Sequence, residues 1–246
     1  MKRRYEKIYS PALGRDMEIL AFGHYGAPLI AFPSGGGAYF DFEGNGMIGA
    51  MQHLIDGGVV KVYCPPSVDR ESWLNKTLDP HYRGHIHNAY QDFIVSNLVP
   101  AIRTDCNDTR IRIALTGCSL GAYHAANHAL KFPHLFHYAL CMSGLYNIGR
   151  LTDHSHSTEV YFNNPLAYLP NLAGSDLSHV QQNTHLALVC GQGAYEDNNL
   201  IETNQLADIL AAKQISHERD IWGHDVEHHW YWWRKQIVYH LEKTFT

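Results

Sequence analysis

Ser119 is the residue of this 246-residue chain best placed to act as a nucleophile. It lies within Gly117-Cys-Ser-Leu-Gly121, a Gly-x-Ser-x-Gly pattern that leaves no room for a loop between the segments on either side. A serine exposed where a strand turns directly into a helix can attack a carbonyl carbon, and the positive helix N-terminus favours the developing oxyanion. The alternative is a structural turn serine, but the flanking strand and helix signals favour a nucleophile.

Carboxylates and histidines follow this serine in the order that a triad on this architecture requires. A serine hydroxyl needs a general base, and the base needs an orienting acid. Two adjacent carboxylates, Glu196 and Asp197, follow one predicted strand, and two histidines, His224 and His228, follow the next. These patterns predict a hydrolytic triad and leave both the acid and the base open.

The oxyanion must be stabilised by backbone N–H groups. One is expected from Leu120, the residue after the nucleophile. The other should come from the segment Ser34-Gly35-Gly36-Gly37, and we expect it to be Gly36. Alternatively, these glycines form only a flexible turn.

Alternating strand and helix patterns run along the chain and would position these residues. Predicted strands cover 5–9, 16–22, 28–33, 59–63, 111–115, 138–142, 185–190 and 217–222. Predicted helices cover 42–55, 87–102, 122–131, 199–213 and 230–243. The first two strands should be antiparallel. The later units imply a single α/β domain over 1–246 with a mostly parallel eight-stranded sheet, helices on both faces, and ligands at the carboxyl ends of the strands. Segment 145–182, rich in Asn, Pro, His and aromatic residues, is expected to form a cap or substrate-side insertion.

Composition excludes several classes of protein. The formal net charge of −5, without a run of Lys and Arg among aromatic residues, argues against a nucleic-acid partner. No apolar run approaches membrane-spanning length, and the charged first residues lead into no apolar signal segment. Five cysteines without paired spacing indicate buried thiols rather than a disulfide framework. We therefore expect a cytoplasmic enzyme without a membrane partner.

At the elbow and in its last 60 residues the chain resembles the putative-esterase family of α/β-hydrolases. That family includes enterobactin-type esterases, S-formylglutathione hydrolases, feruloyl esterases and mycolyltransferases. Its catalytic histidine tends to precede a tryptophan by five residues, and His228 matches this pattern through Trp233 whereas His224 does not. The resemblance therefore implies the α/β-hydrolase fold, with His228 as the base.

The family pattern also favours one of the two carboxylates. The family's acid lies six or seven residues before a small residue followed by Asn, and Asp197 has this relation to Thr203-Asn204. The resemblance thus implies Asp197 as the acid, with Glu196 as the alternative.

Two patterns could suggest a metal. His224-Asp-Val-Glu227-His228 matches the H-x-x-E-H of inverted zinc peptidases, but that chemistry needs a helix, and here a strand precedes the motif. His81, His85 and His87 also lie close together, although among 18 histidines a chance cluster is the better explanation. We therefore predict neither a metal nor a cofactor.

The predicted reaction is hydrolysis of a small-molecule carboxylic ester or thioester through an acyl-enzyme. Acyl transfer to an alcohol and a catalytically silent binding protein on the same scaffold are the alternatives. Aromatic residues in loop 67–84 and in the insertion, including Trp73 and Tyr146, are expected to wall the pocket together with Arg70.

Overall fold

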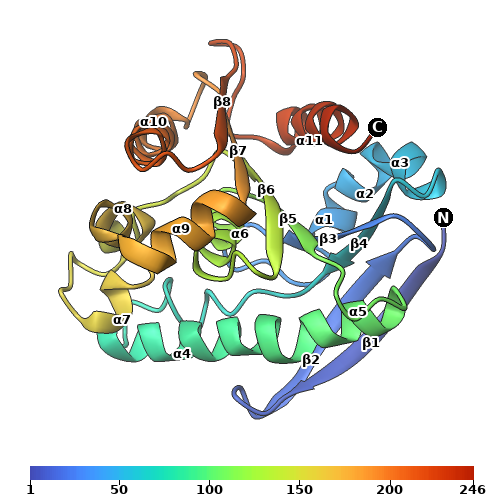
Figure 1. Cartoon of the computed structure of the whole chain (residues 1–246), viewed down its shortest axis with the longest axis horizontal. Coiled ribbons are helices and arrows are strands. Elements are labelled where there is room, and N and C mark those ends of the chain that lie inside the picture. The colour runs from blue at the N-terminus through green and yellow to red at the C-terminus, as the bar shows by residue number, and fades with distance from the viewer.

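The computed structural model describes all 246 residues and contains one eight-stranded sheet in the order β1-β2-β4-β3-β5-β6-β7-β8 (Figure 1). The strands are β1 (Arg3–Ser10), β2 (Arg15–Phe22), β3 (Ala27–Phe32), β4 (Val60–Cys64), β5 (Ile113–Cys118), β6 (Phe136–Met142), β7 (His185–Cys190) and β8 (His217–Ile221). Only β1–β2 and β2–β4 pair antiparallel, and the other five neighbouring pairs are parallel. The predicted eight-stranded, mostly parallel sheet is confirmed.

Helices cover both faces of this sheet (Figure 1). One face packs against α4 (Pro80–Asp92), η1 (Phe93–Leu98), α5 (Val99–Asp105), α6 (Leu120–Lys131) and α10 (Asp197–Ala212). The other face packs against α1 (Asp41–Gly44), α2 (Met47–Ala50), α3 (Gln52–Asp56) and α11 (Trp230–Phe245). Because both faces are buried, the central strands are apolar along their whole length instead of alternating with polar residues.

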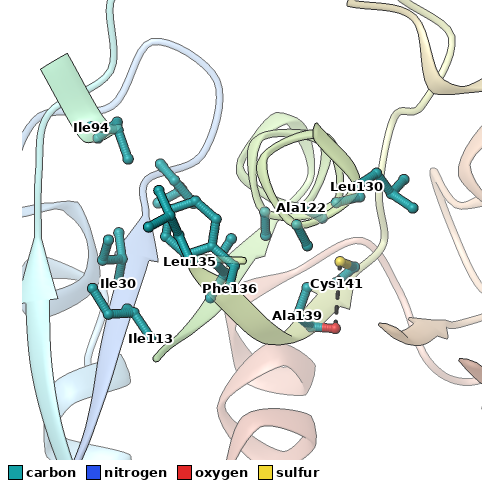
Figure 2. Close-up of a cluster of buried hydrophobic side chains, with 14 of the residues drawn as sticks. Ile30, Ile94, Ile113, Ala122, Leu130, Leu135, Phe136, Ala139 and Cys141 are labelled. Atoms are coloured by element: carbon teal, nitrogen blue, oxygen red, sulfur yellow. Dashed lines mark hydrogen bonds between the residues drawn. The ribbon is translucent and has the colours of Figure 1, made fainter. Parts of the chain in front are cut away.

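Successive side chains of β5 illustrate this arrangement. Ile113 and Leu115 belong to the core under α6, whereas Ala114 and Cys118 belong to the core under α11. Figure 2 shows Ile113 within the first of these cores, with Ala122 projecting from α6 above the sheet. The sheet is therefore anchored on both faces, and the carboxyl ends of its parallel strands are held at one edge.

Two helix predictions need correction. The predicted helix 42–55 is three short helices, interrupted at Gly46, whose φ of 74° is left-handed, and at Met51. The predicted helix 87–102 is the middle of a longer run that begins at Pro80. Asp79 starts that run, because its carboxylate accepts a hydrogen bond from the His81 N–H at 2.8 Å, and proline fits the first helical position. This capping signal was missed.

The segment 145–182 connects β6 to β7 through short helical pieces. They are η2 (Ile148–Leu151), α7 (Thr158–Tyr161), α8 (Pro165–Tyr168), η3 (Leu169–Asn171) and α9 (Gly174–Asn183). The segment is thus more helical than its composition suggested, and α7 lies against the start of α4 (Figure 1). None of the helices has the length and apolar character needed to cross a bilayer.

Candidate active site

Ser119 lies on a strained turn between β5 and α6. Its φ of 57° and ψ of −122° fall outside the regions that residues with a side chain normally adopt. A Cβ on Gly117 would lie 2.3 Å from the backbone of Gly121, and one on Gly121 would lie 2.4 Å from the Pro33 carbonyl oxygen. Only glycine fits at either position, and the predicted direct turn from strand to helix at Ser119 is confirmed.

His228 lies in the turns between β8 and α11, and its acid partner is Glu196. The distance from His228 Nδ1 to Glu196 Oε2 is 3.2 Å, and the Glu196 side chain is 1% exposed. The strands β5, β7 and β8 run parallel, so Ser119, Glu196 and His228 all follow strand ends at the same edge of the sheet.

Asp197 does not contact the histidine, and the expectation that it would is not met. Tyr195 has a left-handed φ of 66°, so the chain reverses just before Glu196 and directs that carboxylate inward. Asp197 is already the first residue of α10 and is exposed. A carboxylate in the first helical turn is favoured there by the helix dipole, which accounts for an acid at this position without a catalytic role.

The buried Glu196 carboxylate has further hydrogen-bond donors. The Ser143 hydroxyl donates to Oε1, and the Trp233 Nε1–H donates to Ser143 Oγ at 2.9 Å. Cys190 Sγ lies 3.5 Å from Oε2. Burial, followed by the neighbouring carboxylate, raises the pKa of the Cys190 thiol, so it remains protonated and unreactive. Ser143 thereby holds Oε1, the oxygen that His228 does not contact, whereas Cys190 and His228 both lie at Oε2.

The loops that carry the acid and the base are hydrogen-bonded to each other. The His228 N–H donates to the Ala194 carbonyl at 3.0 Å, and the Gly193 N–H donates to the Val226 carbonyl at 2.8 Å. Both bonds lie within three residues of Glu196 and of His228 along the chain. The loop after β7 and the loop after β8 are therefore joined directly.

The alternative base, His224, is exposed and makes no hydrogen bond to Glu196 or Asp197. The segment from His224 to His228 lies in turns before α11 instead of inside a helix. The inverted zinc peptidase interpretation therefore lacks the helix that it requires.

The expected oxyanion donors differ in their availability. The Leu120 N–H is at the first position of α6, where no helical acceptor exists. The Gly36 N–H is donated to Asp69 Oδ2 at 3.1 Å, so the expectation of a free N–H at Gly36 is not met. Gly35 makes no such bond and lies beside Leu120, because a Cβ on it would be 3.6 Å from the Leu120 Cβ. Gly35 is therefore the glycine of this turn with an unused N–H next to Leu120.

Asp69 is fully buried and joins this glycine turn to α6. Its Oδ1 lies 2.8 Å from His124 Nε2, and both side chains have no exposed surface. Burial acts to raise the pKa of Asp69, but His124 and the Gly36 N–H outweigh it and hold this pKa below its ordinary value. No local pattern in the sequence marks this pair, because its members lie 55 residues apart.

Most of the residues expected to line the pocket are instead packed beneath the residues around Ser119. Trp73 and Tyr146 are fully buried, so neither can contact a substrate directly. The Arg70 Nε–H donates to the Gly36 carbonyl at 2.9 Å and so braces the glycine turn. Trp73 packs in a cluster with Leu120. These contacts shape the surroundings of Ser119 indirectly.

Neither Ser119 Oγ nor His228 Nε2 is bound to another protein group. No hydrogen bond joins the two residues, and Nε2 is the ring nitrogen that Glu196 does not contact. In unliganded enzymes such bonds are often long and tighten only around the substrate. The arrangement can therefore support nucleophilic attack by a serine with proton transfer to an imidazole.

Known proteins share this architecture. The family described as putative esterase matches residues 10–244. The structure resembles a ferulic acid esterase with a TM-score of 0.76 at 14% identity, covering 99% of this chain and 98% of the other. It resembles the S-formylglutathione hydrolase of Staphylococcus aureus with a TM-score of 0.73 at 14% identity, covering 100% and 97% of the two chains. It resembles MPT51 of Mycobacterium tuberculosis with a TM-score of 0.64 at 15% identity, covering 98% and 97%.

A search of curated protein sequences gives no match. At 13–15% identity the solved structures establish the fold alone, whereas the family match spans nearly the whole chain. The chain therefore belongs to the putative esterase family and has the α/β-hydrolase fold.

Proposed function

We propose that Ser119, His228 and Glu196 are the catalytic triad of a serine esterase. The observation that carries this proposal is the 3.2 Å contact between His228 Nδ1 and the buried Glu196 carboxylate, at the same sheet edge as the strained Ser119. A carboxylate on Nδ1 fixes the tautomer whose Nε2 is free to accept a proton. Glu196 thus takes the role that the family pattern assigned to Asp197.

In the proposed mechanism, His228 Nε2 takes the Ser119 proton as Oγ attacks the carbonyl carbon of the ester. The tetrahedral intermediate collapses when the imidazolium returns the proton to the leaving alcohol or thiol, which leaves an acyl-enzyme on Ser119. Water, deprotonated by the same imidazole, then attacks the acyl carbon and releases the acid. Glu196 remains ionised and stabilises the imidazolium at both steps. This cycle needs no cofactor.

The oxyanion would be held by the Leu120 N–H and by an N–H of the turn Ser34–Gly37. Gly35 is favoured as the second donor, because its N–H has no protein acceptor whereas Asp69 accepts the Gly36 N–H. Two donors aimed at one oxygen stabilise the intermediate more than the neutral ground-state carbonyl.

The proposed substrate is a small-molecule carboxylic ester or thioester. We assign the substrate-side insertion to 145–182, because Leu145 donates its N–H to the Ser119 carbonyl at 3.4 Å and Ile148 packs with Leu120. The net charge of −5 argues against a nucleic-acid partner, and five free cysteines fit the reducing cytoplasm as the location.

Labelling with a fluorophosphonate tests this proposal. We expect one adduct on the Ser119 peptide by mass spectrometry and steady turnover of p-nitrophenyl acetate. Both should be lost in Ser119→Ala, with kcat lowered by about 10⁴-fold or more. Ser178→Ala, a change to a serine on α9 outside the proposed triad, serves as the matched control. Acceleration by added alcohols would favour acyl transfer, and no adduct together with no turnover would favour a silent binding protein.

A further inference from the structure

A histidine pair on α4 lies against a carboxylate on α7, away from the proposed triad. His81 and His85 are four residues apart, so they project from the same side of the helix. Their Nε2 atoms are 3.0 Å apart, and the Glu159 Oε1 is 3.8 Å from His85 Nε2. The three side chains therefore converge their ligand atoms on one small region between the two helices.

Hydrogen bonding prepares these groups to bind a cation. His81 Nδ1 lies 2.5 Å from Glu159 Oε2, so the Nδ1–H donates to the carboxylate. A cation that displaces this proton would be bound by Nδ1 and the carboxylate together, since metal binding deprotonates its ligands. The other carboxylate oxygen, Oε1, lies 3.8 Å from His85 Nε2. His81 Nδ1, His85 Nε2 and the Glu159 carboxylate are thus the available ligands.

Glu159 is held in position by the packing of α7 on α4. A Cβ on Gly84 would lie 2.4 Å from the Glu159 Cβ, so only glycine at this position allows the two helices to approach so closely. The Asn163 side-chain amide donates both to the Glu159 carbonyl and to Asn88 Oδ1 on α4, each at 2.8 Å. The carboxylate is therefore fixed above the turn of α4 that separates the two histidines.

We propose that His81, His85 and Glu159 bind one divalent zinc ion. Zinc bonds of 2.0–2.2 Å in a tetrahedron place ligand atoms about 3.3–3.5 Å apart. The 2.5 Å from His81 Nδ1 to Oε2 and the 3.8 Å from His85 Nε2 to Oε1 lie on either side of this value. Each imidazole is 54% exposed and the carboxylate 17%, so an ion can enter from solvent. Two histidines and one carboxylate match the preferences of zinc and leave a fourth position for water.

The ion would connect α4 to α7 and so stabilise the hydrophobic cluster that packs next to Ser119. Val160, next to Glu159, is buried in the cluster that contains Leu120, the residue after the proposed nucleophile. A link between α4 and Glu159 therefore restrains the segment that shapes this cluster. Zinc binding does not depend on the proposed triad, because it is measured without an ester substrate.

Zinc titration of the chelator-treated full-length protein tests the proposal. We expect one equivalent to bind with a dissociation constant on the order of 1 μM, measured by calorimetry and by competition with a chromophoric chelator. His85→Gln and Glu159→Gln should each weaken this site at least about tenfold. Cobalt(II) should give the visible absorption of a four-coordinate complex in the wild-type protein and lose it in both variants.

His53→Gln is the matched control, since His53 is an equally exposed histidine paired with one carboxylate, Glu242, at 2.8 Å. It should bind zinc as the wild type does. Added zinc should raise the melting temperature of the wild type and His53→Gln but not that of Glu159→Gln. Wild-type affinity in both His85→Gln and Glu159→Gln, or only weak binding at several sites in every protein, would overturn the proposal.

Discussion

The Trp233 indole meets the His228 imidazole edge-on, with ring centroids 4.8 Å apart and planes at 87°. The same indole donates its Nε1–H to Ser143, whose hydroxyl donates to Glu196. One side chain thus packs against the proposed base and, through Ser143, orients the proposed acid. This double contact gives a physical reason for the spacing of five residues between histidine and tryptophan that the sequence shows.

Glu196→Gln should lower kcat by about 10⁴-fold, because a neutral amide no longer stabilises the imidazolium of His228. Asp197→Asn, a change of the same kind one residue away, should stay within about tenfold of the wild type, since Asp197 is exposed. Steady-state kinetics of both variants decide between the acids. Collapse of activity in Asp197→Asn alone would return the role to Asp197.

His228→Gln should remove activity to the same extent as Ser119→Ala, because members of a triad act as a unit. His224→Gln should cost much less, as His224 is exposed and contacts neither carboxylate. Rates of fluorophosphonate labelling provide the measurement. Equal losses in the two histidine variants would contradict the assignment of the base.

Trp233→Phe keeps an aromatic ring beside His228 but removes the donor to Ser143. We expect kcat to fall by about tenfold, roughly the effect of losing one neutral hydrogen bond of 0.5–1.5 kcal/mol, while KM changes little. Ser143→Ala should give a loss of similar size, and the double variant should lose little more than either single variant. Additive losses would show that the two residues act separately.

Asp69→Ala should destabilise the protein by about 3–5 kcal/mol, because it leaves the buried His124 without its partner. The midpoint of urea unfolding measures this loss. Asp69→Asn retains an oxygen that can accept the Gly36 N–H, so it should preserve more of kcat than Asp69→Ala does. Higher kcat in Asp69→Ala than in the wild type would indicate that the released Gly36 N–H is the second oxyanion donor after all.

Low pH should decrease the free energy of unfolding, because buried histidines take up protons when the chain unfolds. Burial, followed by the charge of His124, lowers the pKa of His128 to about 3, and burial also lowers that of His87. The unfolded chain takes up these protons near pH 6.5, so the stabilising contribution is present above that pH and is lost as the pH falls toward 3. Each such histidine adds a slope of up to about 1.36 kcal/mol per pH unit.

Unfolding free energies at pH 7, 5.5 and 4.5 test this expectation. His128→Asn should have a shallower dependence on pH than the wild type, whatever its stability at pH 7. His179→Gln, which changes a histidine near the surface of α9, should leave the slope unchanged. A wild-type stability that is constant over this range would contradict the expectation.

The sheet and the elbow were predictable because their signals are local. Apolar runs mark the strands, and the Gly-x-Ser-x-Gly pattern that marks the turn at Ser119 spans only five residues. The choice between Glu196 and Asp197 depends instead on the left-handed Tyr195, which no residue type there demands. A tyrosine at positive φ is uncommon, so no residue type in this segment predicts that the chain reverses at that point.

Contacts between distant segments were not predictable. The bond between Gly36 and Asp69 spans 33 residues, and Glu159 lies 78 residues from His81. The 18 histidines of the chain favour a chance cluster at residues 81–87, and the helix expected over 87–102 places neither His81 nor His85 on a common helix. Asp79 and Pro80 form a start signal that would have placed both histidines on one side of a helix.

The paired bonds between residues 193–194 and residues 226–228 have a mechanical consequence. Because two backbone hydrogen bonds join the loops that carry Glu196 and His228, a displacement of one loop displaces the other. The contact between Glu196 and His228 is therefore less sensitive to loop motion than the distance from His228 to Ser119, which no hydrogen bond restrains. A ligand that separates Ser119 from His228 would then block the proposed reaction without disturbing the contact between imidazole and carboxylate.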